Sequence, residues 1–192
     1  MPELPEVETI ARELHARLAG RTIVAVEVKR ADVLRLADAE RLGSTCTGLS
    51  IVRVWRRAKT AVISMSGDWH LLVTPRFTGA VLVRDGGLVS PDAALDVAGS
   101  TDGTATSPAD APGDEYTAII WRLADGGCFW YRDVRRLGTV TLADDATLAA
   151  YEAALGDEPL DPGFGADRLS VLLRGSRAAI KKVRSEEHTS EL

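Results

Sequence analysis

The chain has 192 residues, of which 45% are hydrophobic and 27% charged, and this composition excludes a mostly disordered protein. No apolar stretch approaches the roughly 18 residues that a membrane-spanning helix needs, and the N-terminus lacks the basic region of a secretory signal. Cys46 and Cys128 are too few for a disulfide scaffold, and the three histidines lack metal-ligand spacing. We therefore expect a cytoplasmic protein with free thiols, no bound metal and no membrane association.

The formal net charge of −5 is unevenly distributed. Residues 51–84 contain six Arg or Lys and one acid, whereas residues 85–115 contain seven acids and no Arg or Lys. A basic body with an acidic insertion is compatible with a phosphate-binding face. A solvated strand surface rich in arginine explains the same charges equally well.

The first predicted element is an amphipathic helix that follows Pro5 and ends at Gly20. Proline suits the first turn of a helix, and glycine is typical of the position after the last turn. The apolar residues have the i, i+3, i+4, i+7 spacing of one helix face: Val7, Ile10, Ala11, Leu14 and Leu18. The β-branched residues that follow predict a strand over residues 22–28.

Two hairpins are predicted next. The first covers residues 50–84, with Ser-Gly-Asp at 66–68 as its turn, and the second covers residues 116–142, with its turn at 124–127. Residues 85–115 between them are mostly small and polar without apolar periodicity, which predicts a long, flexible acidic insertion.

Helical periodicity returns after residue 142. One predicted helix carries Leu148, Tyr151 and Leu155, a second spans Ala166–Leu173, and a third begins near Ser176. We predict an α+β, mainly β fold. Residues 1–142 form a sandwich of two antiparallel sheets with the N-terminal helix along it, and residues 143–183 begin a second, incomplete helical domain.

The last nine residues, 184–192, read RSEEHTSEL and have no apolar face that continues the third helix. One reading frame of a common sequencing-library adapter encodes this peptide. We therefore expect a non-native tail on a truncated gene, with a natural acidic tail as the alternative.

Five motifs occur in a fixed order along the chain. They are MPELPEVET at the N-terminus, RRAK at 56–59, RDVRRLG at 132–138, LGDEPL at 155–160 and AIK at 179–181. Together they resemble the formamidopyrimidine-DNA glycosylase family (the Fpg/MutM and Nei group), and Leu4 within the first motif favours its Fpg-like branch. The resemblance implies that residues 143–183 open a helix-two-turn-helix module. It also implies a four-cysteine zinc finger that residues 1–192 do not contain, so no cofactor is expected in this segment.

The terminal motif carries a chemical argument of its own. Once Met1 is removed, Pro2 is a secondary amine, and an α-amino group has a pKa of about 7.7–8.0, so a neutral fraction exists near pH 7. Its attack on C1′ of a deoxyribose displaces the base and gives an iminium ion, which is an electron sink for elimination at the sugar. Glu3 is the adjacent acid and base. The alternative is that Pro2 and Pro5 only begin a helix whose dipole the glutamates complement.

Two further residues have expected roles near this terminus. Glu6 is expected to orient the chain terminus and to take no part in the chemistry. The resemblance implies that Lys59 acts at the strand-cleaving lyase step, close to a target phosphate. An exposed strand lysine is the alternative reading of Lys59.

Chemistry on a base within a duplex requires its extrusion, which leaves a void to be filled. The resemblance implies that Phe77, Arg135 and Leu137 fill it, where the family usually has Met and Phe at the first and last of these positions. A phosphate contact is expected for Arg136. The alternatives are a core Phe, a core Leu and an Arg pair held in salt bridges. The resemblance suggests further DNA contacts at Tyr116, Arg177 and Lys181.

The resemblance implies a bifunctional DNA glycosylase/AP lyase that excises oxidised purines, such as 8-oxoguanine and formamidopyrimidines, through a Schiff base on Pro2 in base excision repair. Its partner would be double-stranded DNA that contains oxidised bases or abasic sites. A monomer in the bacterial cytoplasm, associated with the nucleoid, is expected. Two alternatives stay open: a non-catalytic DNA-binding or inactive fragment, and a protein-interaction module that has kept only the fold.

Overall fold

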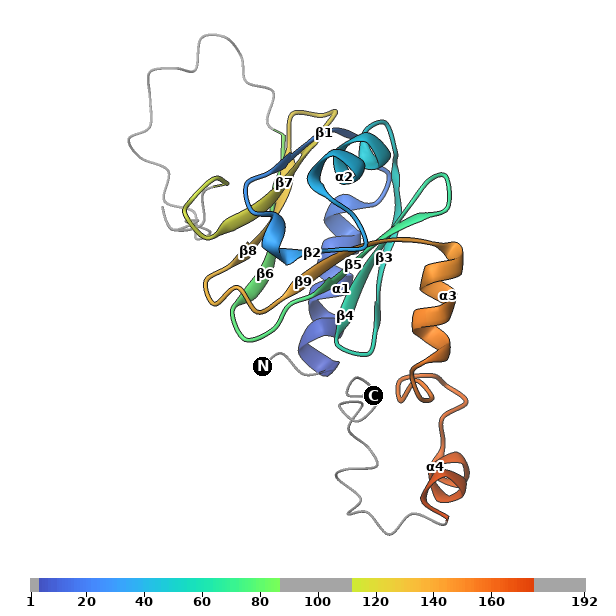
Figure 1. Cartoon of the computed structure of the whole chain (residues 1–192). Helices are drawn as coiled ribbons and strands as arrows, with labels where there is room; N and C mark the ends of the chain where they lie inside the picture. Colours follow the sequence, from blue (N-terminus) through green and yellow to red (C-terminus); the bar gives the residue numbers. More distant parts are fainter. Residues whose placement is uncertain (1–3, 87–111, 175–192) are drawn as a thin grey trace, which may run out of the picture. The chain divides into compact units, whose positions relative to one another are not determined.

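The structure of the chain is a computed structural model, and it describes residues 4–86 and 112–174. By its internal contacts the chain divides into two units, Met1–Asp144 and Asp145–Leu192, and each is described by itself. The helices of the first unit are α1 (Leu4–Leu18), the short 3₁₀ helix η1 (Ala31–Val33) and α2 (Ala39–Cys46); those of the second unit are α3 (Asp145–Ala153) and α4 (Ala166–Leu173) (Figure 1).

Two sheets form the body of the first unit (Figure 1). In hydrogen-bonding order, the four-stranded sheet contains β1 (Ile23–Val28), β7 (Thr117–Leu123), β8 (Cys128–Asp133) and β6 (Gly79–Arg84). The five-stranded sheet contains β2 (Leu34–Arg35), β9 (Thr139–Asp144), β5 (Trp69–Thr74), β4 (Thr60–Met65) and β3 (Ile51–Arg57). The predicted two-sheet fold with an N-terminal helix is therefore confirmed.

The prediction that both sheets are antiparallel throughout needs one correction. Strand β2 pairs with β9 in parallel, with Leu34 opposite Val140. The reason is topological: β1 and η1 bring the chain to the end of the sandwich at which β9 also begins, so both strands leave that end in the same direction.

Helix α1 covers the side of the sandwich where each sheet has an edge strand. Its buried residues are Val7, Ala11, Leu14 and Leu18, which confirms the predicted apolar face. The helix packs against β3 and β4 and also reaches β6. His15 Nδ1 accepts a hydrogen bond from the Val54 amide (3.1 Å), and Arg17 donates to the Val83 carbonyl (3.0 Å). Edge-strand backbone groups are thus satisfied by a helix, which also protects both edges from pairing with another chain.

The core lies between the facing sides of the two sheets. Because strand side chains alternate between faces, every second residue of β7 and β8 enters it. Trp121 and Phe129 stack there with their ring centroids 4.7 Å apart, and Ile63, Leu71 and Leu142 come from the opposite sheet. This core holds the strand ends in fixed register, and the loops that leave those ends are positioned by it.

Both predicted hairpins are cut by loops that cross between the sheets. The turns at 66–68 and 124–127 join β4 to β5 and β7 to β8, as expected. The segment 75–78 takes the chain from β5 in one sheet to β6 in the other, and the segment 134–138 does the same between β8 and β9. The prediction of single long arms was wrong for residues 69–84 and 128–142, because each of these arms contributes a strand to both sheets. It was also wrong for residues 50–65, because this arm contains two paired strands of one sheet, β3 and β4.

The predicted insertion at 85–115 is too wide. Asp85 accepts hydrogen bonds from Arg17 (2.8 Å) and Arg21 (3.2 Å), and Asp114 accepts one from Arg132 (2.7 Å), so the two ends of this segment have defined contacts. Residues 87–111 lie outside the described part of the chain.

Helix α2 was not predicted. Asp38 is its N-cap, and the Asp38 carboxylate accepts a hydrogen bond from the Arg41 amide (2.8 Å). Leu42 and Cys46 are its buried residues, one turn apart. An acidic N-cap followed by apolar residues at i, i+4 spacing was the available signal.

In its described residues, 145–174, the second unit contains the first two of the three predicted helices. The structure gives α4 the predicted bounds, while α3 ends at Ala153 and does not include Leu155, which the prediction placed in this helix. Arg168 and Asp157 form an ion pair within this unit. The predicted third helix from Ser176 and the tail 184–192 lie outside the described residues. In the parts of the chain that the structure describes, no helix has the length and apolar character to span a lipid bilayer.

Candidate functional site

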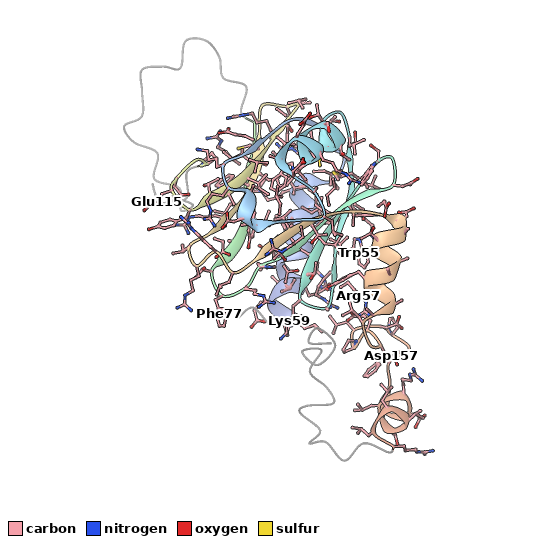
Figure 2. The ribbon with its side chains drawn as sticks, in the orientation of Figure 1. Trp55, Arg57, Lys59, Phe77, Glu115 and Asp157 are labelled. Carbon is pink, nitrogen blue, oxygen red and sulfur yellow. The ribbon has the colours of Figure 1, made fainter. Side chains whose placement is uncertain are left out.

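Three connecting segments lie at one end of the sandwich, which we call the site end: the turn 58–59, the loop 75–78 and the loop 134–138. The strand register brings them together. Thr60 Oγ1, just after the turn, is 2.8 Å from Thr74 Oγ1 at the end of β5, and Thr74 is paired with Thr139, where β9 begins. Figure 2 shows Lys59 and Phe77 on this side of the sandwich.

Lys59 occupies the tip of a two-residue turn. Arg57 and Thr60 are the last paired residues of β3 and β4, so Ala58 and Lys59 alone connect the strands. Ala58 has φ = 54°, which lies in the left-handed region that residues with a Cβ rarely adopt. The Arg56 guanidinium donates a hydrogen bond to the Ala58 carbonyl (3.0 Å) and thereby holds this strained turn. The Lys59 side chain is half-buried and starts from a rigid base.

The beginning of α1 is joined to the same turn. Arg56 Nε donates to Glu8 Oε2 (2.9 Å), so one buried guanidinium contacts both α1 and the turn. His15 meets Val54 farther back on β3, so α1 runs antiparallel to β3 and its N-terminal turn faces the site end. Glu6 is exposed in that first turn.

Pro2 and Glu3 lie outside the described residues, and so do Arg177 and Lys181. Helix α1 begins at Leu4, at the site end of the sandwich. Their predicted roles stay predictions.

Phe77 and Arg135 meet across two loops. The Arg135 Cζ atom lies 5.6 Å from the centroid of the Phe77 ring, in the range of a cation–π contact. Phe77 is 52% exposed and Leu137 is 48% exposed, so neither is the core residue that the alternative reading required. Large apolar side chains left in solvent beside arginines are typical of a surface that enters a nucleic acid.

The charge of these loops is one-sided. The exposed arginines of loops 75–78 and 134–138 are Arg76, Arg135 and Arg136, and neither loop contains an acid. The carboxylate that precedes loop 134–138 in sequence is Asp133, which is fully buried (0% exposed). The Asp133 carboxylate accepts its hydrogen bonds inside the protein and does not reach the surface, so the charges that the two loops expose to solvent are positive.

Asp133 organises the loop 134–138. Its carboxylate accepts hydrogen bonds from Thr78 Oγ1 (2.6 Å), from the Arg135 amide (3.2 Å) and from the Gly138 amide (2.8 Å). Burial alone raises the pKa of Asp133, but the bonds from Thr78 and from the backbone amides outweigh it, and the pKa lies below its ordinary value. The carboxylate is therefore held ionised under the loop that carries Arg135.

Tyr116 also lies at the site end, because its carbonyl accepts a hydrogen bond from the Asp133 amide (3.0 Å). The Arg132 guanidinium lies 5.0 Å from the Tyr116 ring centroid and donates to Asp114 (2.7 Å). Tyr116 is thus fixed at the border of the candidate site.

Comparison with known proteins identifies the family. The family model described as "Formamidopyrimidine-DNA glycosylase N-terminal domain" matches residues 1–140. The chain belongs to the formamidopyrimidine-DNA glycosylase family. The resemblance noted in the sequence is thereby confirmed.

Relatives in the formamidopyrimidine-DNA glycosylase family include the enzymes of that name from Roseiflexus sp. RS-1 (36% identity over 184 residues, 94% of this chain and 58% of the relative) and Moorella thermoacetica (34% over 185 residues, 95% and 59%). Among solved structures, Lactococcus lactis formamidopyrimidine-DNA glycosylase bound non-covalently to DNA with an AP site has a TM-score of 0.72 at 27% identity, covering 94% of this chain and 61% of that one. Its complex with FAPY-dG DNA gives the same score, identity and share of this chain, with 59% of that chain covered. The present chain thus spans about three-fifths of these relatives.

Some residues that organise the candidate site were not identified from the sequence. Asp133 and Arg56 lie within two of the motifs, but no role was predicted for either of them or for Thr78, and Glu8 was expected only to complement the helix dipole. A buried role for Asp133 has no local signal, because Thr78 reaches it from another loop. Among the described residues no three His, Cys, Asp or Glu side chains are grouped to hold a metal ion.

Proposed function

We propose that this chain is the nucleophile-bearing part of a bifunctional DNA glycosylase/AP lyase that excises oxidised purines in base excision repair. The observation that carries the proposal is the site end itself. The N-terminal turn of α1, the Lys59 turn and the exposed Phe77–Arg135 pair all face one end of the sandwich. A nucleophile at the chain terminus and side chains that fill a void in DNA must act on the same nucleotide, so they must share one face.

Pro2 supplies the nucleophile of the proposed reaction. The lone pair of its secondary amine attacks C1′ of the damaged nucleotide, and the bond from C1′ to the base breaks. The nitrogen then loses its proton and the C1′–O4′ bond breaks as O4′ takes up a proton, which opens the sugar ring and leaves an iminium ion between nitrogen and C1′. This ion draws electrons from C2′, whose proton is removed while the 3′ phosphate leaves. Glu3 moves protons at the opening sugar ring. Lys59, on its strained turn, places a cation near the phosphate that departs.

DNA contacts follow from the exposed side chains. Phe77 and Leu137 occupy the space that the extruded nucleotide leaves, Arg135 donates to the partner base, and Arg136 binds a phosphate. Tyr116, Arg177 and Lys181 are proposed as further DNA contacts. The complexes of the Lactococcus lactis protein with abasic-site and FAPY-dG DNA support double-stranded DNA with such lesions as the partner. We propose that the chain acts as a monomer in the cytoplasm, at the nucleoid.

The zinc finger that the family resemblance implied does not fit the residues present. It takes four cysteine ligands, whereas Cys46 and Cys128 are both buried and belong to different clusters of the sandwich. No step of the proposed reaction in this chain uses zinc.

A second candidate function is DNA binding without catalysis. It is favoured by one observation, that loops 75–78 and 134–138 contain exposed arginines and no acid. Affinity for a duplex is largely electrostatic, so such a surface binds phosphates whether or not a terminal amine reacts.

Borohydride trapping separates the two candidates. The full chain is incubated with an abasic or 8-oxoguanine duplex and with reductant, and the adduct is digested and mapped by mass spectrometry. We expect the adduct on the N-terminal peptide, beginning at Pro2, and we expect Lys59→Met to keep the adduct while slowing strand cleavage. Salt-dependent binding without an adduct would support the non-catalytic candidate. Retention of Met1 in the expressed chain would rule out the proposed chemistry for this polypeptide.

A further inference from the structure

The loops that carry Phe77 and Arg135 are joined through side chains. Thr78 Oγ1 donates to Asp133 Oδ1 (2.6 Å) and accepts from the Arg135 amide (2.9 Å). One hydroxyl, adjacent to Phe77 in sequence, therefore contacts both the buried carboxylate and the backbone of Arg135. These two hydrogen bonds join the backbone segments from which the Phe77 ring and the Arg135 guanidinium extend.

The carboxylate also holds its own loop in an unfavourable conformation. Arg136 has φ = 56°, in the left-handed region that arginine rarely adopts. The amides on both sides of it, those of Arg135 and Leu137, donate to Asp133. Such strain persists only where surrounding bonds over-determine the backbone, and here those bonds converge on one carboxylate.

Loop 134–138 is also packed tightly on the side that faces the protein interior. The Asp133 carbonyl accepts a hydrogen bond from Arg30 (3.3 Å), and a Cβ atom on Gly138 would overlap the Tyr131 hydroxyl and lie 2.8 Å from the Thr74 carbonyl. Gly138 therefore packs closely against Tyr131 and Thr74, and a side chain at this position has no room. The exposed tips at Phe77 and Leu137 consequently project from a rigid base.

We infer that Asp133 and Thr78 are positioning residues that lock Phe77 and Arg135 into one preformed unit, and that this unit sets the preference for damaged over intact DNA. The inference rests on the proposed function. Contacts to phosphate give affinity for any duplex, whereas a wedge and a base-directed arginine act only where a nucleotide has left the stack. Loosening the pair therefore reduces lesion preference and leaves binding to an intact duplex nearly unchanged.

Thr78 offers a matched pair of variants. Thr78→Val keeps the shape of the side chain and removes the hydroxyl, and Thr78→Ser keeps the hydroxyl and removes a methyl group. Dissociation constants are measured with the full chain for a duplex with a tetrahydrofuran abasic analogue and for the same duplex intact. The preference is measured by the dissociation constant for the intact duplex divided by that for the abasic duplex. Because a hydrogen bond to a charged group is lost, we expect this ratio to fall about tenfold in Thr78→Val. In Thr78→Ser it should stay within about twofold of the parent. Asp133→Asn is a second variant, expected to lower the ratio further.

A measurement without DNA tests the positioning itself. Amide hydrogen exchange at Arg135 and Gly138 should accelerate in Thr78→Val, while exchange at Val81, within β6, should match the parent. A merely structural role for Thr78 would instead lower the protection of both regions together.

The outcomes separate the inference from the function on which it rests. If the parent prefers the abasic duplex and Thr78→Val keeps that preference, the inference is overturned and the proposed function stands. If both constants rise equally in Thr78→Val, the relay serves general binding only and the inference is again overturned. If the parent itself shows no preference for the abasic duplex, the proposed function fails and the inference fails with it.

Discussion

Arg56 and Glu8 form an ion pair of 2.9 Å in which the arginine side chain is 2% exposed and the carboxylate 25% exposed. The second oxygen of Glu8 pairs with Arg12, whose side chain is 77% exposed. One carboxylate thus faces both the interior and the solvent, and it connects α1 to the Lys59 turn.

Removal of the Glu8 charge should cost far more stability than removal of its exposed partner. Glu8→Gln removes the α1 carboxylate that pairs with the buried Arg56 guanidinium, and we expect the free energy of unfolding to fall by about 2–3 kcal/mol. Arg12→Gln removes only a solvent-screened pair, and the expected change is below about 0.5 kcal/mol. Urea unfolding of both variants checks this. Equal losses would show that the buried pair does not tie α1 to the turn.

Replacement of glycine by alanine should have opposite effects on the free energy of unfolding at two positions of the first unit. A Cβ on Gly138 would collide with the Tyr131 hydroxyl, so Gly138→Ala should lower the free energy of unfolding by about 2 kcal/mol. A Cβ on Gly43, within α2, would meet no atom within 4 Å, so Gly43→Ala should raise it by about 0.5–1 kcal/mol. Thermal unfolding of the two variants gives the signs directly. A stabilising Gly138→Ala would mean that the loop has room to move.

Most of the strands, and the pairings across the turns 66–68 and 124–127, could be predicted from the sequence, but the pairings between distant segments could not. Alternating and β-branched residues mark β3 to β8 locally, whereas the crossings at 75–78 and 134–138 depend on which sheet each half joins. Pairing between distant segments is a property of the whole core and leaves no local signal. Strand β2 has no local signal either, because a strand of two residues is too short to show an alternating pattern.

The site shows the same division. Phe77, Arg135 and Leu137 could be proposed from motifs, and the structure places the first two in contact. Asp133 could not be identified as the organiser of that contact, because an acid beside two arginines predicts a solvated surface. Its burial and its bond to Thr78 exist only after both hairpins have folded.

Phe77 should matter for binding and hardly for folding. Since its side chain is 52% exposed, Phe77→Ala should change the free energy of unfolding by less than about 0.5 kcal/mol. If the ring stacks in the abasic void, the dissociation constant for an abasic duplex should rise about 10- to 30-fold. Val52→Ala is the matched control, because Val52 is 59% exposed near the opposite end of β3. Equal dissociation constants of Phe77→Ala and Val52→Ala for the abasic duplex would show that Phe77 is not part of the proposed interface.

The thiol of Cys46 should be inert in the folded chain. Burial raises the pKa of Cys46 from 9.0 to about 12, so its thiolate fraction at pH 8 is roughly a thousandth of that of an exposed thiol. In a Cys128→Ala background, a thiol-specific disulfide reagent should react with the native chain at least about a hundredfold more slowly than with the chain in urea. Comparable rates would place Cys46 in solvent.

The buried carboxylate of Asp133 should make stability depend on acid pH. Its folded pKa lies below the ordinary value of 3.8, because the bonds from Thr78 and the backbone amides outweigh the effect of burial. A lowered folded pKa means that the ionised carboxylate stabilises the fold above the unfolded pKa. That contribution is lost as the pH falls through the folded pKa.

Urea unfolding of the parent and Asp133→Asn at a series of pH values measures this contribution. The difference in unfolding free energy between the two proteins should be constant from pH 7 to about pH 5 and should shrink below pH 4, because protonation turns the parent carboxylate into a neutral group like the amide. Thr78→Ser keeps the hydroxyl donor and should show the parent's pH dependence. A difference that is independent of pH, or one that grows in acid, would mean that the loop does not depend on the charge of Asp133.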